Sequence, residues 1–179
     1  KIKKDAPAPV AVLSPQSSQV HEFKGHKPTY DSHFETARGN LCHDILSDFI
    51  TIDNEKKIDP LYDKYSKLYE FDFDKAKIIK AIKAFVNLPA VKSLFSNEAD
   101  RAIKTEMEFT DKNGSLRRMD RVIIDKDKIT VMDFKTGAES DGYQKQMTEY
   151  MAILSEVYKK PVEGFIGYID LKKIVNVED

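Results

Sequence analysis

Two charged side chains close an otherwise apolar strand candidate at Ile129–Lys135. Side chains alternate between the two faces of a strand, so Asp133 and Lys135 are expected on one face, about 7 Å apart. Ile129 and Val131 share this face, which makes it apolar until its last two positions. A carboxylate and an ammonium there could bind a cation and stabilise developing negative charge. For this pair taken alone, a strand end that reaches water is the better explanation.

A third charged residue, Asp120, lies on the neighbouring strand candidate Leu116–Ile124. Tight pairing across a turn at Asp125–Lys128 would bring Asp120 close to Asp133 or Lys135. Two carboxylates on one face of a sheet repel each other unless a cation lies between them, and a divalent cation with oxygen ligands is the natural candidate. The alternative is that Asp120 forms a salt bridge with Arg117, Arg118 or Lys135.

The hydrophobic pattern predicts helices first and a sheet afterwards. Apolar residues at helical spacing indicate helices at Phe34–Ile50, Leu61–Tyr69, Asp74–Val86 and Asp141 (or Gly142)–Tyr158, with a further helical turn at Ala90–Phe95. Alternating runs between turn residues indicate strands at Ala102–Phe109, Leu116–Ile124, Ile129–Lys135 and Val162–Leu171, with a hairpin turn at Asp111–Gly114. This order predicts a mixed α/β (α+β) fold, in which a sheet of four or more strands has a three-strand antiparallel meander, a helical crossover and flanking helices.

Composition restricts the partners of the chain. The 179 residues carry a net charge of −1, so any polyanion must be bound through a local basic patch or through metal ions. The helix predicted at Asp74–Val86 has a set of lysines interpreted as a solvated face: Lys75, Lys77, Lys80 and Lys83. No apolar run is long enough for a membrane span and no secretory signal opens the chain, so a cytoplasmic protein without membrane contact is predicted.

The first part of the chain differs from the rest. Residues 1–30 contain four of the seven prolines and are predicted to be a linker or N-terminal extension, in which a short strand around Pro9–Leu13 is one interpretation. Residues 31–179 form the predicted domain. The single cysteine, Cys42, excludes a disulfide framework, a zinc knuckle and a four-cysteine iron–sulfur cluster.

Several short motifs in a fixed order resemble the RecB and AddA nucleases of the PD-(D/E)XK superfamily, in particular the C-terminal nuclease domain of AddA-type ATP-dependent helicase–nucleases. The motifs are Gly39 to His43, Glu106, Asp120-Arg121, Asp133-Phe-Lys-Thr-Gly137 and Gln146 to Tyr150. Phe134 replaces the usual Tyr of the family, and Arg117 replaces a Gly. The resemblance covers about residues 34–170 and implies a restriction-endonuclease-like core.

The resemblance also implies a role for each matching residue. The implied catalytic residues are Asp120, Asp133 and Lys135. The implied metal ligands are the side chains of His43, Glu106, Asp120 and Asp133 and the carbonyl of Phe134. The implied DNA contacts are Arg38, Thr136, Gln146 and Tyr150. One or two Mg²⁺ or Mn²⁺ ions would activate a water and neutralise the leaving oxygen, while the lysine stabilises the charge of the transition state.

A structural role is the alternative for several of these residues. His43 could be a structural or surface histidine, and Glu106 a surface residue of its strand. Gln146 could hold the catalytic lysine instead of contacting DNA, and Tyr150 could be a core residue. Arg38 could form a surface salt bridge with the glutamate three residues before it.

The resemblance implies a metal-dependent DNA nuclease, in particular an exonuclease, that acts in double-strand break repair and recombination. It implies a helicase motor on the same chain, N-terminal to these residues, which delivers single-stranded DNA ends, and an AddB-type partner subunit. The single cysteine favours the AddA-like branch without an iron–sulfur cluster. The alternatives are a catalytically inactive module for DNA docking or subunit contact, an enzyme acting on RNA or another phosphodiester, and a structural domain with salt bridges at its strand ends.

Overall fold

A five-stranded mixed sheet forms the centre of the fold, with the strands in the order β1-β2-β3-β4-β5. The first three strands form an antiparallel meander, β4 pairs with β3 in parallel, and β5 returns antiparallel beside β4. The strands are β1 (Ala102–Thr110), β2 (Leu116–Ile124), β3 (Ile129–Lys135), β4 (Val162–Tyr168) and β5 (Lys173–Val177). The predicted mixed α/β fold, with its meander and helical crossover, is confirmed.

The computed structural model describes residues 30–110 and 114–178, without the side chains of residues 53–55. The strand interpreted around Pro9–Leu13 and most of the predicted turn at Asp111–Gly114 therefore lie outside the described residues.

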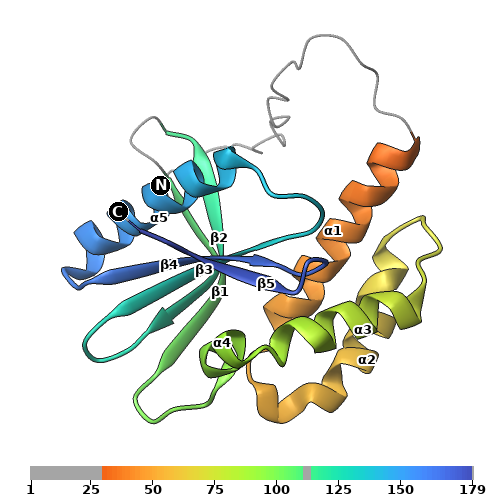
Figure 1. Ribbon diagram of the computed structural model, residues 1–179, viewed down its shortest axis with the longest axis horizontal. Helices are drawn as coiled ribbons and strands as arrows, with labels where there is room; N and C mark the ends of the chain where they lie inside the picture. The colour runs from red at the N-terminus through yellow and green to blue at the C-terminus, as the bar shows by residue number, and fades with distance from the viewer. Residues whose placement is uncertain (1–29, 111–113, 179) are drawn as a thin grey trace, which may run out of the picture.

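Helices cover both faces of the sheet (Figure 1). The crossover helix α5 (Asp141–Tyr158) connects β3 to β4 and packs on one face. The helices of the other face are α1 (Tyr30–Asp48), α2 (Ile58–Tyr65), α3 (Lys75–Val86) and α4 (Pro89–Lys92), of which the first three lie on the right of Figure 1. Short 3₁₀ turns occupy Ile52–Lys57, Ser66–Leu68 and Ser93–Phe95.

Side-chain alternation along β3 divides the core into two parts. Ile129 and Val131 belong to the part packed against α5, whereas Met132 and Phe134 belong to the part packed against α1 to α4. Every residue of β3 before Lys135 is buried. Because a buried charge is costly unless it is paired, the charged residues at the end of this strand require partners.

Two predicted elements differ in extent from the structure. The last predicted strand, Val162–Leu171, ends at Tyr168, and the chain turns through Lys172, at a φ of 51°, into the unpredicted strand β5. This strand is short, so its few apolar residues gave no separate signal. The first helix begins at Tyr30, earlier than the predicted start at Phe34. The hydrophobic pattern missed its first turn, because that turn is exposed and has no apolar periodicity.

A buried arginine attaches the helical layer to β2. Arg121 is 0% exposed, and its Nη2 donates to the carbonyl of Ile50 (2.6 Å) while its Nε donates to that of Leu94 (3.3 Å). Its guanidinium also lies 4.0 Å from the ring centroid of Phe95. Arg121 therefore ties the segment after α1 and the last 3₁₀ turn to the strand that carries Asp120.

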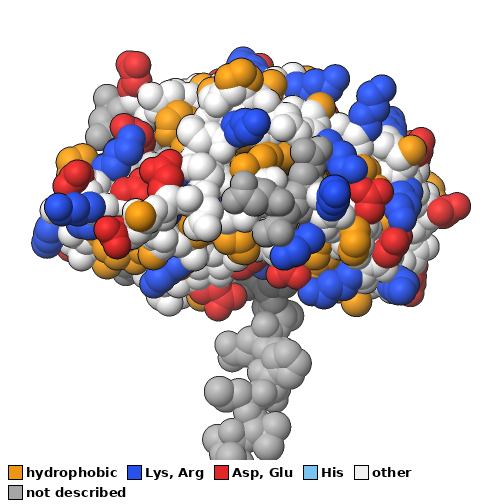
Figure 2. Space-filling model, turned by 90° about the horizontal axis from the view of Figure 1, so that it is seen from below, with side chains coloured by type: hydrophobic (Ala, Val, Ile, Leu, Met, Phe, Trp, Pro, Cys, Tyr) orange, Lys and Arg blue, Asp and Glu red, His pale blue; other side chains and the backbone are white. Residues whose placement is uncertain are grey.

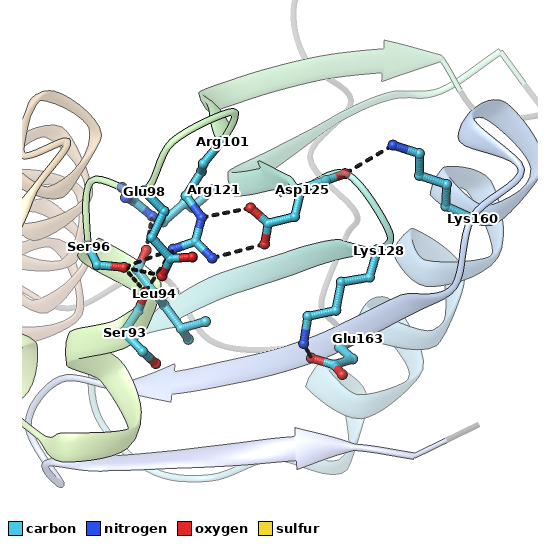
Figure 3. A network of polar contacts seen from close by, with 10 residues as sticks. All are labelled: Ser93, Leu94, Ser96, Glu98, Arg101, Arg121, Asp125, Lys128, Lys160 and Glu163. Atoms are coloured by element: carbon cyan, nitrogen blue, oxygen red, sulfur yellow. Dashed lines mark hydrogen bonds and ion pairs between the residues drawn. The ribbon is translucent and has the colours of Figure 1, made fainter.

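Ion pairs hold the turn between β2 and β3 (Figure 3). Arg101 donates from Nε and Nη2 to the two carboxylate oxygens of Asp125, at 2.8 and 2.9 Å. Lys160 donates to the carbonyl of Asp125 (2.9 Å), and the backbone N of Asp125 donates to the carbonyl of Lys128 (3.0 Å). These contacts fix the register of the two strands that bear the candidate site.

The molecular face in Figure 2 has basic and acidic side chains interspersed, with hydrophobic side chains scattered between them. Such a surface agrees with the net charge of −1 and produces no large field of one sign. Over residues 30–110 and 114–178, none of the helices combines the length and the apolar character that crossing a membrane requires.

Candidate active site

The β2–β3 hairpin brings two aspartates together. Its register, continued one step beyond the pair of Arg121 and Met132, aligns Asp120 with Asp133. The Oδ2 atom of Asp120 accepts a 2.7 Å hydrogen bond from the backbone N of Phe134. Both aspartates are buried. The close approach of two carboxylates, expected from the spacing of the hairpin, is therefore present in the structure.

Three potential metal ligands converge beside this hairpin. His43 of α1, Glu106 of β1 and Asp120 of β2 each offer one ligand atom, and these atoms lie within 4.8 Å of one another. The Nδ1 atom of His43 is 3.3 Å from Oδ2 of Asp120. An imidazole and two carboxylates from three separate elements form a donor set that a divalent cation can use.

Glu106 has an unusual backbone conformation. Its φ is 52°, in the left-handed region that residues other than glycine rarely adopt. The β1–β2 pairing is regular on both sides of Glu106 but omits the pair of Glu106 with Asp120. A left-handed residue costs roughly 1–2 kcal/mol, and such strain gathers at functional sites. The sheet is therefore distorted where the ligand side chains converge.

Lys135 is held from two sides. Its Nζ lies 2.6 Å from Oδ2 of Asp133. From α5, Oε1 of Gln146 accepts a hydrogen bond from Nζ at 3.1 Å, and the ring centroid of Tyr143 lies 4.5 Å away. The latter distance is typical of a cation–π contact. The ammonium is thus fixed by a carboxylate, an amide and an aromatic ring.

Tyr150 anchors this arrangement from the core. Its hydroxyl accepts a hydrogen bond from Nε2 of Gln146 (2.7 Å) and donates to the carbonyl of Arg118 (2.9 Å). The residue is only 2% exposed, so its ring offers no stacking surface to DNA in this structure. Tyr150 therefore lies in the core, as in the alternative considered for it. Similarly, Gln146 contacts Lys135, as in the alternative role considered for that glutamine.

Burial and neighbouring charges shift the pKa values of the titratable groups at the site. Burial, followed by the charge of Asp120, raises the pKa of Asp133 to about 6 against the influence of Lys135. Burial alone would lower the pKa of His43, but its contact with Asp120 outweighs this effect, and the pKa is raised. Burial also raises the pKa of Glu106, which pairs with an arginine of β2 at 2.7 Å. A divalent cation would favour the charged form of each carboxylate.

The donors at the site fit such a cation. The ligand atoms of His43, Glu106 and Asp120 lie within 4.8 Å of one another, so these residues would hold the cation. Asp133 lies beside them, and its Oδ2 forms an ion pair with Lys135 at 2.6 Å. Two buried carboxylates so close together are favoured by a cation near them. The backbone of Phe134 lies next to these residues, since its N–H donates to Asp120, while its side chain lies in the core.

Arg38 and Thr136 lie where α1 meets the end of β3. Both Nη atoms of Arg38 donate to Asp170, at 3.0 and 2.7 Å, and its Nε donates to Glu35 at 2.9 Å. The salt bridge to Glu35, considered as the alternative to a DNA contact of Arg38, is therefore present, and a DNA phosphate would compete with two carboxylates for this guanidinium. Thr136 is packed so closely that a Cβ atom at Gly39 would lie 2.9 Å from its Oγ1.

Two residues near the site escaped prediction. Tyr143 lies under the ammonium of Lys135, and its position three residues before Gln146, on the same helical face, was the available signal. Asp170 binds Arg38 and accepts a 2.9 Å hydrogen bond from the backbone N of Gly137. It follows β4, and the ends of parallel neighbours meet at one edge of the sheet, which would have placed it beside the end of β3.

No protein of curated function matches the chain. The sequence profile of the PD-(D/E)XK nuclease superfamily, by contrast, matches residues 19–178, a range that includes every strand and helix described above. The chain therefore belongs to the PD-(D/E)XK nuclease superfamily.

Proposed function

We propose that this chain is a Mg²⁺- or Mn²⁺-dependent deoxyribonuclease, in particular an exonuclease of the RecB/AddA branch of its superfamily. The observation that carries the proposal is the convergence of the ligand atoms of His43, Glu106 and the buried Asp120 beside the ion pair of Asp133 and Lys135. Hydrolysis of a phosphodiester requires a cation at the phosphate, an oriented water and a positive group for the developing charge. Residues suited to each requirement are gathered here.

A divalent ion bound at this site would activate a water and neutralise the leaving oxygen. The hydrogen bond from the Phe134 amide fixes Asp120 in position to serve as a ligand. Lys135, oriented by Gln146 and Tyr143, can position the attacking water and stabilise negative charge on the phosphorane oxygens. Because these groups are held in place before the substrate arrives, little reorganisation is needed during the reaction.

The order of the motifs supports a wider context for this activity. In our proposal, the domain acts in double-strand break repair and recombination, together with a helicase motor N-terminal to it on the same chain and an AddB-type partner subunit. The motor would supply single-stranded DNA ends. The net charge of −1 favours such delivery, because the chain has no overall field to collect DNA by itself. Cytoplasmic localisation is part of the same proposal.

A cleavage assay with labelled single-stranded DNA, double-stranded DNA and RNA tests this function in the presence of Mg²⁺, Mn²⁺ or EDTA. We expect metal-dependent cleavage of DNA. Asp133→Asn and Lys135→Met should each lower kcat by about 10²-fold or more, with an unchanged circular dichroism spectrum. Lys128→Met is the matched control, because this lysine is exposed and pairs on the surface with Glu163.

Three outcomes contradict the proposal in different ways. Full cleavage by both site variants would refute the assignment of the active site. Metal-dependent DNA binding by the wild type without turnover would identify an inactive docking module. Cleavage of RNA with little cleavage of DNA would identify the enzyme as a ribonuclease.

A further inference from the structure

We propose that a recess between α1, α3 and the turn from β4 to β5 binds a nucleotide of a DNA single strand, beside the cleavage site. The proposal rests on the DNA nuclease function proposed above. The recess has a volume of about 460 Å³, within the range of roughly 300–1,000 Å³ that is usual for small-ligand sites. The three elements that form it lie together on the right of Figure 1.

The carboxylates in the wall of this recess already have partners. Asp170 and Glu35 both accept hydrogen bonds from Arg38. Asp74 caps α3 by accepting a hydrogen bond from the backbone N of Lys77 at 3.0 Å. Since each negative group is satisfied within the protein, none of them needs a positive ligand.

The lysines in the wall, by contrast, have no direct carboxylate partner, and the charge of Lys77 helps to hold the pKa of Asp170 below its ordinary value. Lys77, Lys80 and Lys172 are exposed, and their side chains form no ion pair with any other residue in the described part of the chain. On the same helix α3, Lys75 and Lys83 are each paired with an aspartate of α2. The lysines predicted as one solvated face therefore divide into a paired set and a set that surrounds the recess. An anionic ligand in the recess would form charge-assisted hydrogen bonds with the lysines that surround it.

The floor of the recess is apolar. Phe34 and Phe73 lie there with ring centroids 5.3 Å apart, and Ile78 and Ala81 of α3 extend the apolar surface. Sites for single-stranded nucleic acid combine a positive groove that follows the backbone with apolar or aromatic surface for unstacked bases. The recess offers both features, whereas an acidic peptide would leave the apolar floor without a matching group.

The recess is connected to the cleavage site. Asp170, in its wall, accepts a hydrogen bond from the backbone N of Gly137, two residues after Lys135. Arg38, also in its wall, precedes His43 by five residues on α1, about 7.5 Å of helix rise and about 140° of rotation, so the two side chains leave different faces of the helix. A strand bound at the cleavage site would therefore reach the recess past Gly137 at the end of β3.

Fluorescence anisotropy with a labelled oligo(dT) of about 12 nucleotides, in EDTA, measures this binding without cleavage. We expect Lys77→Glu/Lys80→Glu to weaken binding at least about tenfold and to lower the salt slope by roughly 1.4, because each phosphate contact of a single strand contributes ~0.7. Lys67→Glu/Lys92→Glu, the same change of charge at exposed lysines outside the recess, should leave the affinity within about twofold of the wild type. Lys77→Gln/Lys80→Gln provides a milder version if the charge reversal disturbs folding.

Equal affinity and equal salt slopes for the two charge-reversed variants would overturn the proposal, as would the absence of binding by the wild type. Displacement of oligo(dT) by polyglutamate as readily as by unlabelled oligo(dT) would overturn it in favour of an acidic protein segment. Phe34→Ala should weaken binding of oligo(dT) more than binding of an abasic strand. The binding assay in EDTA is independent of cleavage. Failure of the wild type to cleave DNA in the presence of metal therefore counts against the proposed function, whereas unchanged binding by the Lys77→Glu/Lys80→Glu variant counts against the proposed nucleotide site in the recess.

Discussion

Gly39 of α1 lies against Thr136, so closely that a Cβ atom at residue 39 would be 2.9 Å from Thr136 Oγ1. Alanine at this position gains about 1 kcal/mol of helix propensity but displaces the residue that follows Lys135. We therefore expect Gly39→Ala to lower kcat about tenfold or more while the free energy of unfolding changes little. Gly142→Ala is the control, because its Cβ would meet nothing closer than Ser140 Oγ at 3.7 Å. Wild-type kcat in Gly39→Ala would mean that Thr136 adapts without effect on the site.

Tyr150→Phe tests the chain of hydrogen bonds that holds Lys135, the proposed catalytic lysine. Loss of the hydroxyl removes one hydrogen-bond partner from the Gln146 amide and one from the Arg118 carbonyl, which should cost about 1–3 kcal/mol of stability. Gln146 would then hold Lys135 less firmly, so kcat should fall while KM stays nearly constant. Urea unfolding and steady-state kinetics measure both effects. Tyr158→Phe, at a half-buried tyrosine of the same helix, should change neither; equal behaviour of the two variants would contradict the prediction.

Gly167→Ala tests the packing between β4 and α3. A Cβ atom at residue 167 would lie 2.5 Å from Cζ of Phe85, a rigid ring in the core. We expect a loss of about 1–3 kcal/mol in the free energy of unfolding, because overpacking forces side chains or backbone to shift. Combining Gly167→Ala with Phe85→Leu should recover part of this loss in urea unfolding. If the second change only adds to the first, the contact is not the cause.

Asp170 should make stability depend on pH. Its hydrogen bonds from Arg38, against a smaller effect of burial, hold its pKa below the ordinary value. A lowered folded-state pKa contributes stability that is fully present above the unfolded pKa of about 3.9 and is lost as pH falls through the folded value. Asp170→Asn should therefore be less stable than the wild type at neutral pH, and the difference should shrink below about pH 4. Unfolding curves measured across this range, with the exposed Asp127→Asn as control, would refute the prediction if the difference stayed constant.

The strands that carry the site could be predicted closely from the sequence. The bounds of β2 and β3 agree with the alternation of apolar residues, because each strand is limited by turn residues and buried on at least one face. The proximity of Asp120 and Asp133 followed from the short connection between them. These features depend on local pairing, which the sequence pattern expresses directly.

Other features depend on long-range packing and could not be predicted. Glu106 has a left-handed backbone that no sequence motif indicated, and its approach to His43 joins α1 and β1, which are far apart in the sequence. The helix pattern of Tyr150 was compatible with both a core position and a DNA contact, and the fold decides for the core. Asp170 had no motif around it, so its bond to Arg38 required the position of the β4–β5 turn.

The strand that bears Asp133 and Lys135 pairs on its second side with a segment that follows much later in the sequence. β3 pairs with β4 along its whole length, and the carbonyl of Lys135 accepts a 2.9 Å hydrogen bond from the backbone N of Ile169. During synthesis, a ribosome-bound chain that ends before Val162 already contains every proposed ligand, but β3 is then an unprotected edge strand. We expect the site to become fully formed only after residues 162–168 have left the ribosome, because until then β3 lacks the neighbour that pairs with it along its whole length.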